Sequence, residues 1–235
     1  MATPLLFVTS ANAVNATLYG HLSFDFVRDI APVGTIGQTS FVVVVNPAFP
    51  PKTIPEFIAY AKANPGKINM ASQGNGSIPH VAGELFNMMA GIEMLHIPYR
   101  SNPLPDLLAG QVQVYFGPIP TVIGNIRAGT LRALAVSSAT PSEVLPAIPT
   151  IGEFVPGYEA VGRNGIGAPK DTPTEITEKL NREINAGLAD AKLRGQIAEL
   201  GSVPTPLTTT EFSKIISSEV EKWGKVVKFT GIKLE

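Results

Sequence analysis

Two patterns of apolar residues alternate along the chain. Short runs of β-branched and other apolar residues are typical of buried strands, whereas longer stretches with apolar residues every three or four positions are typical of amphipathic helices. Their alternation favours an α/β fold with mostly parallel sheets, because parallel strands need helical crossovers between them. The predicted strands are Leu5–Thr9, Ile36–Asn46, Ile68–Ala71, Leu95–Ile97, Val112–Phe116, Leu131–Ser137 and Val161–Ala168.

Capping residues mark where several helices begin. A threonine followed three residues later by glutamate is the sequence signature of a capping box. This pattern occurs at Thr53, Thr172 and Thr208, each followed by an amphipathic stretch. Further helices are predicted from Ser77 to Gly91, over Pro103–Ala109 and over Pro120–Ala128.

The order of these elements is compatible with two lobes. Residues 1–40 and 160–235 would form the first lobe, and residues 41–159 the second. Two crossings between lobes suit a protein that closes about a hinge, because few residues must absorb the rotation. A single α/β domain would give much the same pattern, so periodicity alone leaves both organisations open.

Composition and charge exclude several classes of function. The net charge is −1, so the chain lacks the basic surface of a nucleic-acid-binding protein. It has no cysteine, which excludes disulfides, thiolate metal sites and cysteine nucleophiles. The apolar run Phe41–Val45 is far too short to cross a membrane. Leu5–Val8 is preceded by no basic residue and is shorter than the apolar region of a signal peptide, so we interpret it as a buried strand.

The most specific local feature is the segment Ala71–His80, with the sequence ASQGNGSIPH. It follows a predicted strand and opens a predicted helix. Gly74 and Gly76 permit positive φ and leave backbone N–H groups uncovered, and Ser77 starts the helix. Free N–H groups at the positive end of a helix dipole can bind an anion without a charged side chain. We expect His80 to lie close enough to donate a further hydrogen bond.

Two nucleotide-binding interpretations of this segment fail. A P-loop would need a lysine after the glycines, and none is present. A dinucleotide fingerprint would need a small residue at Pro79 and an acidic residue after the next strand, which reads Leu95–Ile97. A tight turn with Ser77 as a purely structural cap stays open beside anion binding.

The remaining polar residues indicate binding rather than catalysis. The three histidines have no metal-ligand spacing, and His96 is expected to be a satisfied core residue. No Gly-x-Ser-x-Gly motif is present, and the acidic residues before position 170 are scattered. Polar residues gather instead at the ends of predicted strands, where ligands of parallel sheets collect. They are Thr9, Ser10 and Asn12; Tyr99 and Arg100; and Arg163 and Asn164.

Several motifs together resemble the extracytoplasmic solute-binding proteins of tripartite tricarboxylate transporters, the Bug-type receptors. The likeness extends over the whole chain and includes the glycine segment described above. The other motifs that carry it are Ser10–Tyr19, Phe26–Val33, Asn64–Met70, Gly83–Phe86, His96–Arg100, Asp106–Val112, Ile126–Ser138 and Pro156–Tyr158.

This resemblance implies a two-lobed periplasmic-binding-protein-like fold. It implies a periplasmic receptor that closes over a small mono- or dicarboxylate and delivers it to membrane permease subunits, with no catalysis, cofactor or metal. In this family glycine-containing loops from both lobes hold one ligand carboxylate. The residues implicated here are Gly74, Asn75, Gly76 and Ser77 with His80 behind them in the second lobe, Thr9, Ser10 and Asn12 in the first lobe, and Arg163 and Asn164 towards the distal end of the ligand.

The sequence departs from the family pattern in three places. The family normally has a signal peptide and two further βα units before the position of Met1, so we expect a first lobe that is truncated at its N-terminus. Arg100, Ser101 and Asn102 stand where a basic residue followed by glycine is usual. Arg163 and Asn164 occupy a position where an aromatic residue is common.

Two alternatives to the receptor function stay open at this point. One is an α/β enzyme that acts on a small anionic metabolite with His80 as general acid or base. The other is a non-functional fragment of the receptor, since missing strands would leave a sheet edge and apolar helix faces exposed.

Overall fold

The computed structural model describes residues 4–19 and 21–232. The chain divides into two compact units. One, here called the terminal unit, combines the chain up to Thr39 with the chain from Gly162 onward. The other, the central unit, runs from Ser40 to Val161.

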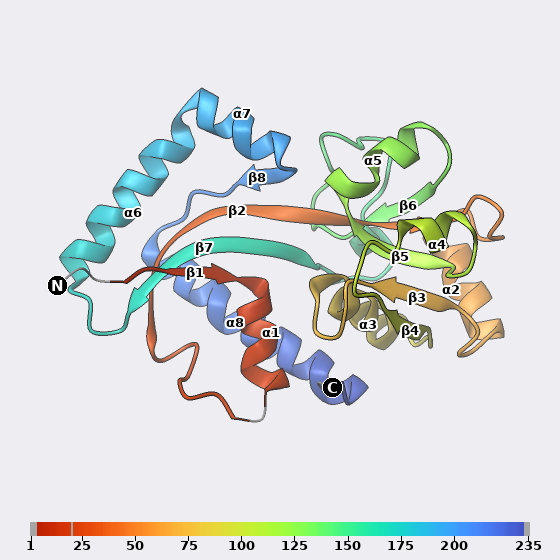
Figure 1. The fold of residues 1–235 in the computed structure, drawn as a ribbon, viewed down its shortest axis with the longest axis horizontal. Coiled ribbons are helices and arrows are strands. Elements are labelled where there is room, and N and C mark those ends of the chain that lie inside the picture. Colours follow the sequence, from red (N-terminus) through yellow and green to blue (C-terminus); the bar gives the residue numbers. More distant parts are fainter. Residues whose placement is uncertain (1–3, 20, 233–235) are drawn as a thin grey trace. The chain divides into compact units, whose positions relative to one another are not determined.

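The sheet of the central unit is built around three short parallel strands. β3 (Asn69–Ser72) lies between β4 (Leu95–Pro98) and β5 (Val114–Pro118). The last residues of β2 (Ile30–Val45) pair antiparallel with β5 on one side and with β6 (Arg132–Val136) on the other. Figure 1 shows these strands with the helices that connect them.

The α/β class is confirmed, but the sheets are mixed rather than mostly parallel. β5 and β6 both run antiparallel to β2, and β1 (Leu6–Thr9) pairs antiparallel with β7 (Val161–Pro169). The helical connections do give β3, β4 and β5 one direction, as the alternation predicted. A buried apolar run such as Val42–Val45 carries no signal of direction, so the sequence could not show that β2 opposes its neighbours.

The predicted helices of the central unit are all present. Thr53 caps the first of them by accepting a hydrogen bond from the Glu56 N–H at 3.3 Å. The helix that follows the glycine segment ends at Gly91, whose φ of 62° provides the left-handed C-cap. These helices are α2 (Ile54–Ala63), α3 (Ile78–Ala90), α4 (Leu104–Leu108) and α5 (Ile119–Arg127). A short 3₁₀ turn over Ile151–Glu153 was not predicted.

An aromatic cluster anchors α3 to the sheet. Phe86 of α3 lies between Phe57 of α2 and Phe116 of β5, with ring centroids 5.9 and 6.0 Å away, and all three side chains are fully buried. Burial of each ring contributes about 1.5–3 kcal/mol to folding. Because α3 is fixed in this way, the glycine loop that precedes it is fixed at one end.

The terminal unit combines strands from both ends of the chain. Besides the β1–β7 pair, β8 (Ser202–Pro204) pairs antiparallel with residues Gly37–Thr39 of β2. The helices are α1 (Ser10–Leu18), α6 (Thr174–Ala189), α7 (Ala191–Glu199) and α8 (Thr209–Thr230).

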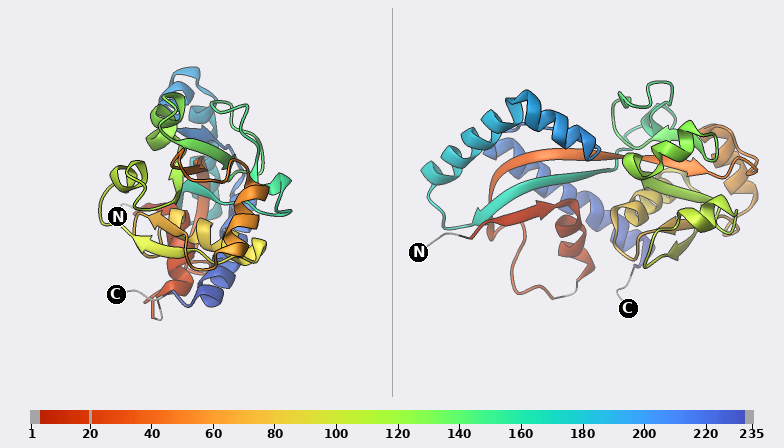
Figure 2. Two further views of the ribbon diagram at one scale, coloured as in Figure 1. Left: turned by 90° about the vertical axis from the view of Figure 1, so that its right-hand side faces the viewer. Right: turned by 45° about the horizontal axis from the view of Figure 1, so that its top comes forward.

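Two contacts hold the helices of the terminal unit in place. α1 packs along α8, the red and dark blue helices of Figure 2, and Trp223 of α8 is fully buried. α6 is tied to β2 by Asn181, whose side-chain amide donates to the Val33 and Leu207 carbonyl oxygens, each at 2.8 Å.

Three expectations about the terminal unit need correction. α6 begins at Thr174 with Pro173 as its N-cap, so the capping box predicted at Thr172 does not form. α7 and β8 were not predicted, because Asp190 both ends α6 and caps α7 without a break in helical composition. Finally, β2 begins at Ile30, earlier than the predicted Ile36. Within residues 4–19 and 21–232, no helix combines the length and apolar character needed to cross a membrane.

Candidate functional site

The glycine segment forms the predicted strand–loop–helix unit. β3 ends at Ser72, and Ser77 is the N-cap of α3. Gly74 and Gly76 have φ values of 108° and 74°, a region that side chains other than glycine rarely adopt. We call residues 73–77 the glycine loop.

Hydrogen bonds within the glycine loop correct the expectation that its N–H groups are free. The Gly74 N–H donates to Ser72 Oγ at 3.1 Å, the Gly76 N–H to His80 Nδ1 at 3.1 Å, and the Ser77 N–H to the Gly74 carbonyl oxygen at 3.2 Å. The Ser77 hydroxyl also donates to that carbonyl, at 2.8 Å, and makes no cap bond to α3. The loop is therefore preorganised by hydrogen bonds within it and to Ser72 and His80 on either side of it.

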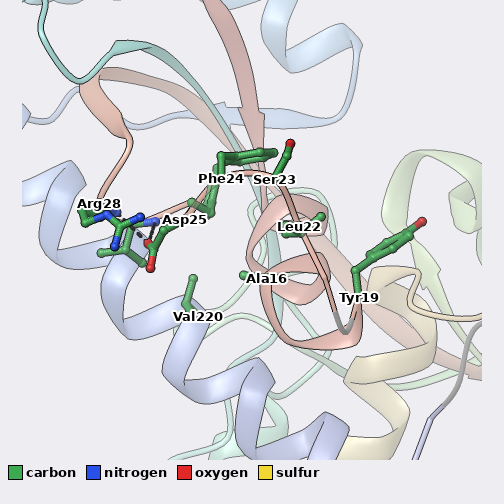
Figure 3. Close-up of a pocket in the computed structure, with 10 residues that line it drawn as sticks. Ala16, Tyr19, Leu22, Ser23, Phe24, Asp25, Arg28 and Val220 are labelled. Atoms are coloured by element: carbon green, nitrogen blue, oxygen red, sulfur yellow. Dashed lines mark hydrogen bonds between the residues drawn. The ribbon is translucent and has the colours of Figure 1, made fainter.

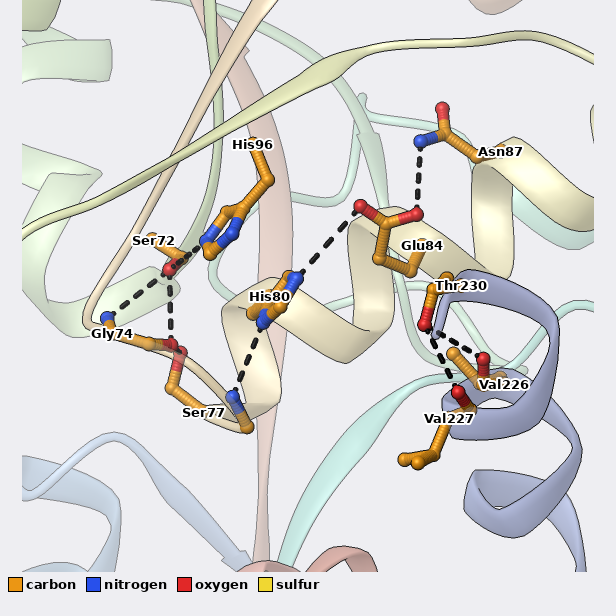
Figure 4. Close-up of polar contacts among 11 residues, drawn as sticks. Ser72, Gly74, Ser77, His80, Glu84, Asn87, His96, Val226, Val227 and Thr230 are labelled. Atoms are coloured by element: carbon orange, nitrogen blue, oxygen red, sulfur yellow. Dashed lines mark hydrogen bonds and ion pairs between the residues drawn. The ribbon is translucent and has the colours of Figure 1, made fainter. Parts of the chain in front are cut away.

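Two stacked histidines lie behind the loop (Figure 4). The rings of His80 and His96 are 3.4 Å apart between centroids and within 7° of parallel. Burial, together with the neighbouring His96, lowers the pKa of His80 to about 3, and burial lowers the pKa of His96 to about 4. Both rings are therefore neutral near pH 7. His96 Nε2 lies 2.6 Å from Ser72 Oγ, so the stack is joined to both ends of the loop.

The hydrogen bond from Gly76 fixes the role of His80. Because His80 Nδ1 accepts this bond, its proton is on Nε2, which lies 3.8 Å from Glu84 Oε1. Burial raises the pKa of Glu84, and Asn87 donates to its other oxygen at 3.2 Å. His80 is 3% exposed, so it supports the loop from inside and does not present the donor that we expected from the sequence.

A pocket opens beside the glycine loop at the carboxyl ends of the parallel strands. Ser72 and Pro98 are register partners, and the Tyr99 N–H donates to the Ser72 carbonyl oxygen at 3.0 Å, so the loops after β3 and β4 are adjacent. Thr121 comes from the first turns of α5, just after β5. The volume is about 390 Å³, and the lining residues are Gln73, Tyr99, Arg100, Ser101, Asn102 and Thr121.

Sequence reasoning found part of this pocket. Tyr99 and Arg100 stand out as polar residues at a strand end. Gln73, Asn102 and Thr121 were missed, because they meet only through the order of β4, β3 and β5 in the sheet. The signal that was available is their position within four residues after a strand, near the strand ends where parallel sheets bind ligands.

The predicted residues at the end of β1 are used to start α1. Asn12 Oδ1 accepts hydrogen bonds from the Thr9 N–H at 2.8 Å and from the Thr9 hydroxyl at 3.1 Å. Asn164 is the register partner of Thr9 in the β1–β7 pair. The structure therefore brings Thr9, Asn12 and Asn164 together within the terminal unit.

Ser10 and Arg163 belong to a second polar cluster of the terminal unit. Ser10 Oγ accepts from the Arg163 N–H at 2.9 Å and donates to Glu219 at 3.3 Å. The Arg163 guanidinium donates to Gln38 Oε1 at 2.8 Å and lies 4.0 Å from Glu219. Glu219 also accepts from the Trp223 indole at 2.8 Å. Lys222 pairs with the same carboxylate at 2.5 Å, so Glu219 is shared between two cations.

The terminal unit also has a pocket of about 450 Å³ (Figure 3). None of the predicted site residues is among its lining residues. It lies between α1, α8 and the segment that leads into β2, and Arg28 on its wall forms an ion pair with Asp29 at 3.1 Å. Among the described residues, no group of three His, Asp or Glu side chains could hold a metal ion.

Comparisons with known proteins agree on one family. The model of the tripartite tricarboxylate transporter family receptor, TctC, matches residues 3–232. Protein BugT of Bordetella pertussis is 35% identical over 226 residues, which cover 95% of this chain and 69% of BugT.

Solved structures show the same relationship. R. palustris Rpa4515, whose structure contains adipate, superposes with a TM-score of 0.81 at 30% identity, over 97% of this chain and 78% of that protein. A periplasmic transporter gives a TM-score of 0.80 at 33% identity, over 98% of this chain and 79% of the other. These likenesses confirm the periplasmic-binding-protein-like fold.

The family consists of solute receptors and not of enzymes. That finding agrees with the buried, neutral His80, which has neither the exposure nor the pKa of a general acid or base near pH 7. It removes the enzyme alternative left open by the sequence. The chain belongs to the TctC family of tripartite tricarboxylate transporter receptors, and carboxylates are the class of solute that this family binds.

Proposed function

We propose that this protein is a periplasmic receptor that captures a small mono- or dicarboxylate and delivers it to the membrane permease subunits of a tripartite tricarboxylate transporter. Family membership supports the receptor function, and the adipate in the structure of Rpa4515 supports a carboxylate as the solute. The permease and the periplasmic location follow from the family and are part of the proposal.

One observation carries the choice of site. The glycine loop lies at the carboxyl end of β3, the middle strand of the parallel set, and at the N-terminus of α3. The first N–H groups of a helix have no partner within the helix, and its dipole is positive at that end. A carboxylate is stabilised there without a full positive charge.

In this proposal Gly74, Asn75, Gly76 and Ser77 hold one carboxylate. The N–H bonds inside the loop, at 3.1–3.2 Å, are at the long end of the hydrogen-bond range, so the N–H groups can be shared with a carboxylate oxygen. His80 acts as a positioning residue that fixes the Gly76 N–H.

The terminal unit contains the other residues implied by the family resemblance. We propose that the two units are the lobes of the receptor and that Thr9, Ser10, Asn12, Arg163 and Asn164 are the solute-binding residues of the terminal unit. The chain passes between the units at Thr39–Ser40 and at Val161–Gly162. Closure on the solute would rotate the backbone at these two crossings.

Thermal unfolding with a panel of acids tests the proposal. The panel contains C4–C6 dicarboxylates, acidic amino acids and aromatic acids. A bound acid at about 100 times its Kd stabilises the folded state by about 2.7 kcal/mol, which raises Tm by roughly 5–10 °C for a chain of this size. Cooperative unfolding with no shift for any acid would contradict the proposal, and the absence of cooperative unfolding would favour a non-functional fragment.

A further inference from the structure

The pocket beside the glycine loop contains an arginine with no partner in the fold. Arg100 is exposed, and no hydrogen bond or ion pair joins its guanidinium to any other residue in the described parts of the chain. Arg132 of the same unit is different, because its guanidinium donates to the carbonyl oxygens of Phe49, Pro51 and Pro47 at 3.0–3.3 Å. The positive charge of Arg100 is therefore available to a ligand.

None of the other residues that line the pocket is acidic. Asp106 is not among the lining residues, and it accepts the Tyr99 hydroxyl at 2.7 Å. Burial and this hydrogen bond raise the pKa of Tyr99 to about 12, so the phenol keeps its proton and adds no negative charge. Asn102 Oδ1 is occupied by the Leu104 N–H at 3.1 Å, which leaves its amide N–H groups as donors.

The position of Arg100 relates it to the glycine loop. Arg100 is the second residue after β4, and the glycine loop starts directly after β3, the parallel neighbour of β4. Gln73 belongs to the loop and also lines the pocket. A Cβ atom on Gly74 would lie 3.9 Å from the Tyr99 carbonyl oxygen, so the two strand-end segments approach each other closely.

We propose that this pocket is a second anion subsite in which Arg100 binds the far carboxylate of a linear dicarboxylate. The inference rests on the proposed function, since the glycine loop holds the first carboxylate. A guanidinium can bind a carboxylate through two parallel N–H···O bonds, a geometry that a single amide cannot reproduce. Arg100 then selects dicarboxylates over monocarboxylates.

Calorimetric titration of the whole chain tests the subsite. Succinate, glutarate and adipate are each compared with the monocarboxylate of the same carbon number: butyrate, valerate and hexanoate. We expect the wild type to prefer at least one dicarboxylate. Arg100→Gln should weaken binding of that dicarboxylate about tenfold or more and leave its monocarboxylate partner within about twofold, because only the dianion uses the guanidinium. Arg127→Gln, an exposed arginine at the end of α5, is the matched control and should change neither.

The outcomes separate the two claims. If Arg100→Gln keeps the dicarboxylate preference, or if the wild type binds both acids of every pair equally, the subsite is overturned and the receptor function stands. If the wild type binds none of the six acids, the subsite for a linear dicarboxylate is overturned, and the proposed function fails as well only if no acid of the wider thermal-unfolding panel binds. Equal losses of dicarboxylate affinity in Arg100→Gln and Arg127→Gln would show that the net charge of the protein, and not a contact with Arg100, causes the loss. That result would also overturn the subsite.

Discussion

At the scale of single residues, the histidine pair shows how a buried polar group can serve a binding loop. His80 holds the Gly76 N–H, and His96 lies against Ser72, which in turn accepts the Gly74 N–H. This bond requires a neutral His80 ring with no proton on Nδ1, because a protonated imidazole has no acceptor nitrogen. The conformation of the loop therefore depends on the protonation state of a buried residue behind it.

This dependence predicts lower stability in acid. Burial lowers the pKa of His80 from 6.5 to about 3, so the unfolded chain binds a proton that the folded chain does not. The stability that the depressed pKa of His80 contributes is fully present above pH 6.5. It is lost as the pH falls, and about 2.5 kcal/mol of it is gone at about pH 4.5. The raised pKa of Glu84 makes the folded state more stable as the pH falls, which opposes the effect of His80. A comparison of variants that all retain Glu84 cancels this effect.

Urea unfolding of the wild type and His80→Gln at about pH 7 and pH 4.5 measures this contribution. Glutamine can accept the Gly76 N–H but does not titrate in this range. The wild type should lose more stability on acidification than His80→Gln does. Equal losses in the two proteins would show that His80 is not buried as a neutral ring.

Sequence reasoning reached the residues of the glycine loop but not their bonds. Gly74 and Gly76 can be placed from the strand–glycine–helix pattern, since only glycine adopts their φ values readily. The hydrogen-bond partners of the loop cannot be placed from that pattern. His96 is 24 residues from Ser72 in the sequence, and the two meet only because β3 and β4 are paired in this register. The same long-range register hides the pocket around Arg100.

At the scale of secondary structure, two identical sequence signals have different outcomes. Thr208 forms the predicted capping box of α8, with its hydroxyl oxygen accepting the Glu211 N–H at 3.2 Å. Thr172 has the same spacing to Glu175, but α6 starts after Pro173 and the buried Thr172 hydroxyl has no hydrogen-bond partner. A residue before proline is pushed out of the helical region, yet the sequence alone does not show which residue becomes the cap.

Alanine substitutions should separate these two threonines. Thr208→Ala removes a working cap and should lower the free energy of unfolding by about 1 kcal/mol. Thr172→Ala removes no hydrogen bond and should change it by less than about 0.5 kcal/mol. Chemical denaturation of both variants measures the difference. A loss in Thr172→Ala as large as that in Thr208→Ala would mean that Thr172 caps α6 in solution.

At the scale of the whole molecule, the strand order explains what the sequence could and could not predict. Helical crossovers are visible in the sequence, and they correctly predict the common direction of β3, β4 and β5. The direction of β2 relative to its neighbours cannot be predicted from the sequence. β2 continues from one unit into the other, and its buried apolar run has no feature that distinguishes a parallel from an antiparallel strand. The family resemblance, which uses motifs over the whole chain, supplied the fold that periodicity left open.

The division into two units also places the proposed functions. The glycine loop and Arg100 lie in the central unit, whereas the clusters around Thr9 and Arg163 lie in the terminal unit. In the proposal, the carboxylate-binding groups of the central unit are the N-terminus of α3 with its glycine loop and the guanidinium of Arg100.

The proposal that the glycine loop binds a carboxylate can be tested by calorimetric titration of two variants at one position. Gly76→Asp and Gly76→Asn add side chains of nearly the same shape at the same positive φ, and only the aspartate adds a negative charge. We expect Gly76→Asp to bind the best acid of the panel at least about tenfold more weakly than Gly76→Asn, because like charges repel at the site. Equal affinities in the two variants would contradict the proposal.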